Sequence, residues 1–184
     1  MRKLIVSSFV SLDGVVDKPW EWVGSFFDQE HKQDSLTKLK DVDLFLLSRP
    51  TYEHFASLWP NIKGEAYFDH MNALPKLVAS KTIKEAGWNA TVINGEVTEE
   101  IARLKQGPGK HILKYGFGDL DRTLMLHHLI DELQLCIIPV AVGKGRRIFE
   151  GMDPDQVKLI LTDIRNFENG AAILTYVPSG SKKQ

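Results

Sequence analysis

The sequence predicts an α/β protein with a largely parallel sheet, helices on both faces and an antiparallel edge. Two observations lead to this prediction. Short apolar runs alternate with helical patterns along most of the chain. Near the C-terminus, Asn169-Gly170 separates two strand-like segments, which is a strong signal for a two-residue hairpin. Because ligands of such sheets bind at the carboxyl ends of the strands, the residues that follow each strand are the first candidates for a site.

The N-terminal half of the chain begins with a strand and then alternates helices with a second strand. The strands are rich in Ile, Val, Leu and Phe, and the helices show amphipathic spacing. Thr51 can cap the second helix, and Pro75 ends the third. We expect strands at Lys3–Val10 and Asp43–Leu47, and helices at Gln29–Lys40, Thr51–Trp59 and Ala66–Leu74.

The C-terminal half continues the alternation and ends in the hairpin. A Gly-Pro-Gly sequence breaks the first of its helices, and a glycine turn precedes the second. We expect helices at Val97–Lys105 and Thr123–His128, and strands at Lys76–Ala79, Thr91–Ile93, His111–Tyr115, Glu132–Ile138, Val157–Leu161, Asp163–Phe167 and Ala171–Tyr176.

Composition places the chain among ordinary globular proteins. It has 184 residues, 43% of them hydrophobic, and a net charge of −1, so no global field attracts nucleic acid. We expect one domain over residues 1–178 and a polar tail over 179–184. No apolar stretch reaches membrane-helix length, the N-terminus is a strand rather than a signal peptide, and the single cysteine forms no internal disulfide. We therefore expect a cytoplasmic protein without membrane or nucleic-acid partners.

A glycine pair follows the strand that ends at Tyr115. Gly116 and Gly118 stand where a strand turns into a helix, and such glycines let the backbone approach a bulky anion beside the unpaired amides of the new helix. The dinucleotide fingerprint is incomplete, because Asp121 stands in place of its third glycine. A tight turn without a ligand is the alternative.

Other strand ends agree with this indication. Three of them place a cation beside hydroxyl groups or glycines, a combination suited to phosphate. They are Ser48–Glu53, Ser80–Thr82 and Gly143–Arg147. Together they indicate a phosphate-rich ligand. Metal chemistry is not indicated, since the six histidines form no metal-binding motif.

An ordered set of motifs spans nearly the whole chain. These motifs are Ser11–Gly14, Leu47–Glu53, Leu77–Thr82, Tyr115–Leu120, Ile130–Leu133 and Pro139–Gly145. In these motifs the chain resembles the dihydrofolate-reductase-like superfamily. It is most similar to the reductase domain of riboflavin biosynthesis, which is the C-terminal domain of the bifunctional deaminase-reductase, and to its stand-alone bacterial relatives. The resemblance implies a three-layer α/β/α fold with a central sheet of about eight strands.

The resemblance also implies NADPH as hydride donor and a set of residues that bind it. The implied cofactor-binding residues are Gly14, Ser48, Arg49, Thr51, Ser80, Lys81, Gly116, Phe117, Gly118, Asp119 and Leu120. Within this set, Ser80 and Lys81 would meet the adenosine 2′-phosphate, and the residues from Gly116 to Asp119 would wrap the pyrophosphate. The family usually has glycine at position 48 and a small residue at 117, so Ser48 and Phe117 are departures that bear on cofactor affinity.

The candidate substrate region lies on two loops. Asp13 is the catalytic candidate, beside Gly14, with a turn-forming role as the alternative. Gly143 and Gly145 would line the substrate pocket together with Trp20 and Trp22, although the two tryptophans could equally form a small core or a dimer contact. Folate reductases carry an acid on the helix after the first loop, and here Asp28, Glu30 and Asp34 offer no clear match.

The expected function is an NADPH-dependent reductase of the riboflavin-biosynthesis group. It would transfer hydride to a small heterocyclic or ribosylaminopyrimidine-type substrate, as in 5-amino-6-(5-phosphoribosylamino)uracil reduction. The alternatives are dihydrofolate reductase activity and a non-catalytic protein that binds a small molecule on the same fold. The resemblance further implies a homodimer formed through an edge strand, for which Leu133–Ile138 is the candidate.

Overall fold

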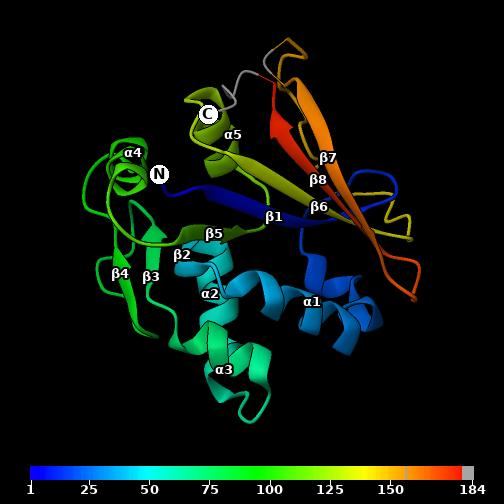
Figure 1. The fold of residues 1–184 in the computed structure, drawn as a ribbon, viewed down its shortest axis with the longest axis horizontal. Coiled ribbons are helices and arrows are strands. Elements are labelled where there is room, and N and C mark those ends of the chain that lie inside the picture. Colours follow the sequence, from blue (N-terminus) through cyan, green and yellow to red (C-terminus); the bar gives the residue numbers. More distant parts are fainter. Residues whose placement is uncertain (156, 180–184) are drawn as a thin grey trace. The chain divides into compact units, whose positions relative to one another are not determined.

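Eight strands follow the order β4-β3-β2-β5-β1-β6-β8-β7 in the computed structural model, which describes residues 1–155 and 157–179 (Figure 1). The strands are β1 (Leu4–Ser11), β2 (Val42–Ser48), β3 (Lys76–Ala79), β4 (Ala90–Val92), β5 (His111–Tyr115), β6 (Glu132–Ile138), β7 (Leu159–Asn166) and β8 (Ala172–Pro178). The predicted mostly parallel sheet with a C-terminal antiparallel hairpin is confirmed.

Five α-helices connect the strands within the described residues. They are α1 (Gln29–Leu39), α2 (Arg49–Leu58), α3 (Ala66–Ala73), α4 (Val97–Gln106) and α5 (Asp119–Leu126). In the described part of the chain, no helix combines the length and apolarity that crossing a membrane would require. The expected polar tail lies outside the described residues from position 180 onward.

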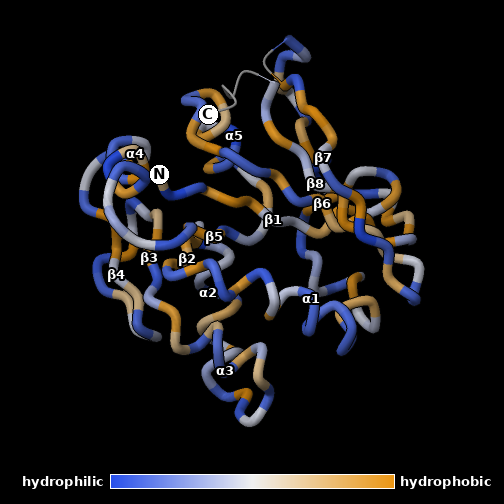
Figure 2. The backbone as a smooth tube through the Cα atoms, in the orientation of Figure 1, coloured by the Kyte–Doolittle hydropathy of each residue, from blue (hydrophilic) through white to orange (hydrophobic). Residues whose placement is uncertain are grey.

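The chain divides into two units that are described separately. The first unit comprises Met1–Leu4 and Lys32–Tyr115, and the second comprises Ile5–His31 and the residues from Gly116 onward. In the first unit, β2 pairs in parallel with β3 and β5, and β3 pairs in parallel with β4. Helices α2 and α3 lie on one side of these strands and α4 on the other (Figure 1). Apolar residues concentrate along the strands (Figure 2), and Phe45, Leu46 and Leu47 of β2 are fully buried.

Two helices begin earlier than the sequence predicts. Helix α2 starts at Arg49 with Ser48 as its N-cap residue, so the expected start at Thr51 with Thr51 as the cap is wrong. Pro50 falls in the first turn, where its missing N–H has no cost. Helix α5 starts at Asp119 rather than Thr123, and the structure of the glycine turn described below explains this start.

In the second unit, β6 lies between two partners. It pairs in parallel with β1 and antiparallel with β8, and β8 pairs in turn with β7. The expectation that Leu133–Ile138 is an edge strand available to a second copy is therefore wrong, because both of its hydrogen-bonding edges are occupied.

The C-terminal hairpin contains one long strand where the sequence predicts two short ones. Strand β7 (Leu159–Asn166) joins most of the expected segments Val157–Leu161 and Asp163–Phe167 into one strand, with a register shift between Leu161 and Asp163. A register irregularity of this kind interrupts the alternation of inward and outward side chains, so in the sequence one strand looks like two. The hairpin at Asn169-Gly170 is confirmed, but the expected two-residue loop is wrong. The amide of Phe167 donates to Ala171 O at 2.9 Å, which leaves a loop of three residues, and Gly170 takes the positive φ, of 88°, that such a loop requires at its last position.

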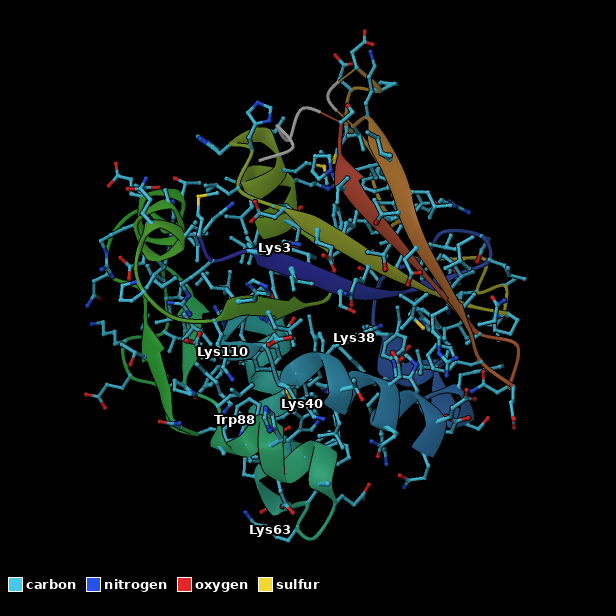
Figure 3. All side chains as sticks on the ribbon, viewed as in Figure 1. Lys3, Lys38, Lys40, Lys63, Trp88 and Lys110 are labelled. Atoms are coloured by element: carbon cyan, nitrogen blue, oxygen red, sulfur yellow. The ribbon has the colours of Figure 1, made fainter. Side chains whose placement is uncertain are left out.

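A buried lysine connects α3 to β3 in the first unit. Lys76 is 1% exposed, and its ammonium donates to the carbonyls of Leu74 at 2.6 Å and Asn72 at 3.1 Å. The same nitrogen lies 4.3 Å from the centre of the Trp88 ring; Figure 3 labels Trp88. Burial lowers the pKa of Lys76 to about 8, because a desolvated ammonium is less stable than a hydrated one.

We predict that the free energy of unfolding rises with pH in the wild type, relative to a Lys76→Met variant, as pH increases from about 8 toward 10.5. In this range the unfolded lysine still binds a proton that the folded lysine has lost, so deprotonation favours the folded state. Below this range both forms are protonated and the contribution is constant. Urea unfolding at steps between about pH 7 and 10 measures the difference. Parallel curves for the two proteins would contradict the assignment.

Candidate functional site

Hydroxyl groups and an arginine gather after β2 and β3 in the first unit. The hydroxyl groups of Ser48 and Thr51 lie 3.0 Å apart, and Arg49 Nη1 donates to Thr82 Oγ1 at 2.6 Å. Ser80 Oγ accepts the amide of Ile83 at 3.0 Å and so shapes the turn after β3. Because β2 and β3 are parallel neighbours, their carboxyl ends meet at the same edge. The structure thus brings together the predicted residues of these two loops.

Thr82 belongs to this group although it is not among the cofactor-binding residues that the family resemblance implies. The signal was present, because Thr82 follows Ser80-Lys81 at the strand end. Arg49 is further fixed by Glu53, whose Oε1 accepts from Arg49 Nε at 2.7 Å. Lys81 is exposed, and its ammonium makes no hydrogen bond or ion pair to any described residue. The loop after β3 therefore presents an uncommitted positive charge.

Ser48 does not disturb the backbone at the start of α2. Its φ of −72° and ψ of 157° are extended values that any residue adopts, so the Cβ introduces no strain. Its hydroxyl contacts Thr51 and adds a polar group to the cluster. The departure from glycine at this position therefore changes the chemistry of the loop rather than its shape.

The glycine turn of the second unit is closed by an aspartate. Gly116 has a φ of 81°, and its amide donates to Ser7 O at 2.8 Å. The amide of Gly118 donates to Asp121 Oδ2 at 2.8 Å, and Asp121 is fully buried. A carboxylate at this position stabilises the start of a helix, which explains why α5 begins at Asp119.

Space remains open beside Gly118. Its φ of −161° is extended backbone, and a Cβ at this position would meet no atom of the described residues within 4 Å. Neither backbone conformation nor internal packing therefore accounts for glycine here. Open space at a helix start is what the close approach of an anionic ligand requires.

The ring of Phe117 is packed inside the protein and is not free to contact a ligand. Phe117 is buried, and its ring packs edge-on against Phe149 with centroids 5.2 Å apart. It therefore neither stacks freely on a ligand nor stands exposed in the turn, and only its backbone is available. Asp119 is exposed and Leu120 half-buried in the first turn of α5.

Asp13 is a strong hydrogen-bond acceptor. Its carboxylate accepts from Ser11 Oγ at 2.6 Å, from the amide of Val142 at 3.0 Å and from the amide of Gly143 at 2.8 Å. These bonds, that of Ser11 first, hold the pKa of Asp13 well below its usual range. Asp13 therefore stays ionised at neutral pH, which suits it to holding the Val142–Gly143 segment and not to donating a proton.

Further contacts fasten the following segment to the same loop. Gly14 O accepts the amide of Ile148 at 2.8 Å, and Arg147 Nε donates to Asp13 O at 3.0 Å. Gly145 has a φ of 112°, and a Cβ there would lie 2.9 Å from Val15 Cγ1. The predicted loops around Asp13 and Gly145 are thus brought together in the structure.

The aromatic loop forms a small core for the most part. Trp22 donates its indole N–H to Asp17 O at 2.9 Å, and with Phe26 and Phe27 it packs on a buried cluster that includes Cys136 and Phe167. Trp20 is instead 47% exposed. The sequence left open whether these tryptophans form a wall or a core, and the structure places Trp22 in a core.

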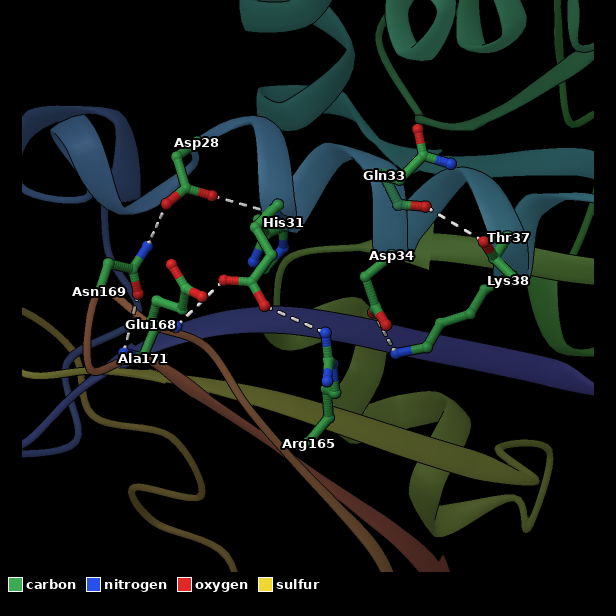
Figure 4. A network of polar contacts seen from close by, with 11 residues as sticks. Asp28, His31, Gln33, Asp34, Thr37, Lys38, Arg165, Glu168, Asn169 and Ala171 are labelled. Atoms are coloured by element: carbon green, nitrogen blue, oxygen red, sulfur yellow. Dashed lines mark hydrogen bonds and ion pairs between the residues drawn. The ribbon is translucent and has the colours of Figure 1, made fainter.

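Two of the three candidate acids, Asp28 just before α1 and Glu30 within it, contact the C-terminal hairpin. Asp28 accepts from the amide of His31 at 3.0 Å and from Asn169 Nδ2 at 2.8 Å, and Arg165 Nη2 donates to Glu30 at 3.1 Å (Figure 4). The bond from His31 is the main cause that lowers the pKa of Asp28. Asp34 pairs with Lys38 at 2.8 Å (Figure 4). Asp28 is therefore held as an anion, and Glu30 and Asp34 each bind a cation.

No group of three His, Cys, Asp or Glu side chains in the described ranges is arranged to hold a metal ion.

The family model of the RibD C-terminal domain matches residues 2–173. The chain belongs to this family. It is 27% identical over 180 residues to the uncharacterized protein YyaP of Bacillus subtilis (strain 168), covering 95% of this chain and 94% of YyaP. The RibD C-terminal domain family thus accounts for nearly the whole chain, which supports an oxidoreductase of the riboflavin-biosynthesis reductase group.

Solved structures show the same fold at low sequence identity. A proposed riboflavin biosynthesis protein from Shewanella sp. PV-4 superposes with a TM-score of 0.73 at 19% identity, over 96% of this chain and 98% of that one. Dihydrofolate reductase from Enterococcus faecalis, complexed with NADP(H) and RAB-propyl, superposes with a TM-score of 0.61 at 17% identity, over 96% of each chain. The predicted dihydrofolate-reductase-like fold of this RibD-family chain is confirmed.

We predict different effects of alanine at two glycines of the second unit. Gly145→Ala should lower the free energy of unfolding by about 2 kcal/mol, because it combines a strained backbone with a collision against Val15. Gly118→Ala should lower it by no more than about 1 kcal/mol, the cost of alanine in place of glycine at the N-cap of α5, because its backbone is extended and its surroundings are open. Urea unfolding of both variants tests this. A marked loss for Gly118→Ala would show that the space beside it is not open.

Proposed function

We propose that the protein is an NADPH-dependent reductase that transfers hydride to a small heterocyclic or ribosylaminopyrimidine-type substrate. Membership of the RibD C-terminal domain family supports a reductase of this group. The observation that supports NADPH in this chain is the cluster after β2 and β3, where Arg49, Thr82 and the free ammonium of Lys81 lie on adjoining loops.

The chemistry of this cluster fits a phosphate monoester. Arginine and lysine supply charge-assisted donors, and the hydroxyl groups of Ser80 and Thr82 add neutral ones. In NADPH the adenosine 2′-phosphate is such a group, and NADH lacks it. We therefore assign Arg49, Ser80, Lys81 and Thr82 to the 2′-phosphate.

The glycine turn of the second unit fits a pyrophosphate. The space beside Gly118 is open, and the first amides of α5, at Asp119 and Leu120, belong to the set that has no partner within a helix. The amides of Gly116 and Gly118 are already bound to Ser7 and Asp121. The later amides of the turn are therefore the ones proposed to contact the ligand.

NADPH supplies a hydride when bound, and the protein has to hold and orient the reacting groups. Asp13 holds the Val142–Gly143 segment in place as a permanent anion. Neither Asp13 nor Asp28 keeps a carboxyl proton at neutral pH, since hydrogen bonds lower both pKa values. The proton that completes the reduction is therefore proposed to come from water.

Folate reductases carry an acid on the helix after the first loop. Here hydrogen bonds lower the pKa of Asp28, and Glu30 and Asp34 each pair with a cation, which weakens the case for dihydrofolate reductase activity. The lack of an assigned protein proton donor favours one other candidate, a non-catalytic protein that binds a flat ligand on this fold. The two candidates differ in a measurable way. A reductase oxidises NADPH in the presence of its substrate, which lowers the absorbance of the reduced nicotinamide.

We predict that Arg49→Ala combined with Lys81→Ala weakens NADPH binding at least about tenfold and changes NADH binding little. The reason is that both cations are assigned to the 2′-phosphate, which only NADPH carries. Titration of tryptophan fluorescence with both nucleotides measures the two affinities. Arg103→Ala is the matched control, because Arg103 is an exposed arginine whose guanidinium pairs with Glu100. Equal losses for both nucleotides would remove the 2′-phosphate assignment, and absence of NADPH binding by the wild type would refute the proposed function.

We also predict that Gly118→Ala weakens NADPH binding about tenfold or more with little loss of stability. The added methyl group would occupy the space assigned to the pyrophosphate. Gly87→Ala is the control, because a Cβ at Gly87 also meets no described atom within 4 Å, yet Gly87 lies outside the proposed site. Unchanged affinity in Gly118→Ala would place the ligand elsewhere.

A further inference from the structure

The glycine turn carries negative charges of its own. Asp119 and Asp121 both belong to the first turn of α5. The carboxylate of Asp121 is buried and accepts the amide of Gly118, so it serves the helix start. Asp119 is 81% exposed, and its charge would repel a phosphate group placed at the turn. A cation that offsets Asp119 is therefore needed for an anion to bind here.

Arg146 is the cation that meets Asp119. The distance from Arg146 Nη1 to Asp119 Oδ1 is 2.6 Å. Arg146 is 38% exposed, so it is the more buried member of the pair. Arg122, the basic residue within α5, makes no ion pair to any residue in the described part of the chain. The charge of Asp119 is thus balanced from outside its own helix.

Asp17 fixes Arg146 in this position. Asp17 Oδ2 accepts the amide of Arg146 at 2.8 Å, and Asp17 Oδ1 lies 3.7 Å from Arg146 Nε. On the other side of the same residue, the carbonyl of Arg146 accepts the amide of Val16 at 3.0 Å. The backbone of Arg146 is therefore bound at both its N–H and its C=O, and the guanidinium extends from a fixed point toward Asp119.

We propose that Arg146 is a positioning residue of the cofactor site: it neutralises Asp119 at the Gly116–Gly118 turn, and Asp17 holds it there. The inference rests on the proposed function, which assigns a pyrophosphate to this turn. Without Arg146, Asp119 would keep its negative charge at the turn with no ion pair in the described part of the chain. The negative charge of Asp119 would then repel a pyrophosphate at the turn, although the open space beside Gly118 could accommodate it.

The test compares three ligands by calorimetric titration: NADPH, inorganic pyrophosphate and adenosine 2′-monophosphate. Arg146→Gln should weaken the first two about fivefold, the size of a partly exposed charge interaction. It should leave adenosine 2′-monophosphate unchanged, because that ligand carries the phosphate assigned to the first unit and no pyrophosphate. A general loss of structure would weaken all three ligands alike.

A second substitution tests neutralisation directly. Arg146→Gln combined with Asp119→Asn has the same net charge as the wild type, so its affinity for NADPH should return to within about twofold of the wild-type value. Arg146→Lys should likewise keep most of the affinity, because the charge is retained. Arg165→Gln is the matched control, since Arg165 is a comparably exposed arginine of the second unit that pairs with Glu30.

The outcomes separate this inference from the proposed function. Normal NADPH binding by Arg146→Gln, or failure of the double variant to recover, would overturn the role of Arg146 and leave the reductase proposal standing. Pyrophosphate binding that depends on Arg146 in a wild type that does not bind NADPH would uphold the inference and refute the cofactor. A wild type that binds neither ligand would overturn both.

Discussion

Parallel pairing of β2 with β3 is the constraint on which the candidate phosphate cluster depends. It places the carboxyl ends of the two strands at one edge, so that residues separated by about thirty positions in sequence contact each other, as Arg49 and Thr82 do. Hydrogen bonds then hold the side chains of these two loops in position. Glu53 accepts a hydrogen bond from Nε of Arg49, and Thr82 accepts one from Nη1. Ser80 shapes the turn that carries Lys81.

In the second unit, carboxylates that bind backbone amides have the corresponding role. Asp13 holds Val142 and Gly143, Asp17 holds Arg146, and Asp121 holds Gly118. Each of these aspartates organises a loop or a helix start because its oxygens accept N–H groups that would otherwise lack partners. Their number makes this region rich in negative charge, and the Arg146–Asp119 ion pair offsets part of that charge, which is the basis of the role proposed for Arg146.

The sequence predicts the architecture well and individual side chains less well. Strand positions follow from local apolar patterns, and those patterns identify the parallel strands and the Asn169-Gly170 hairpin. The start of α2 was misplaced because both Ser48 and Thr51 are suitable caps, and only the backbone conformation distinguishes them. The burial of Phe117 against Phe149 and the binding of the Val142 and Gly143 amides by Asp13 depend on residues distant in sequence, which no local pattern reveals.

The four tryptophans are divided evenly between the two units. Trp59 and Trp88 belong to the first unit, where their rings meet edge to face with centroids 5.9 Å apart, and Trp20 and Trp22 belong to the second. Each unit therefore contains its own optical reporter. Replacing one pair by phenylalanine leaves emission that follows the other unit alone, so the cooperativity of unfolding between the two units can be read from intrinsic fluorescence without any attached dye.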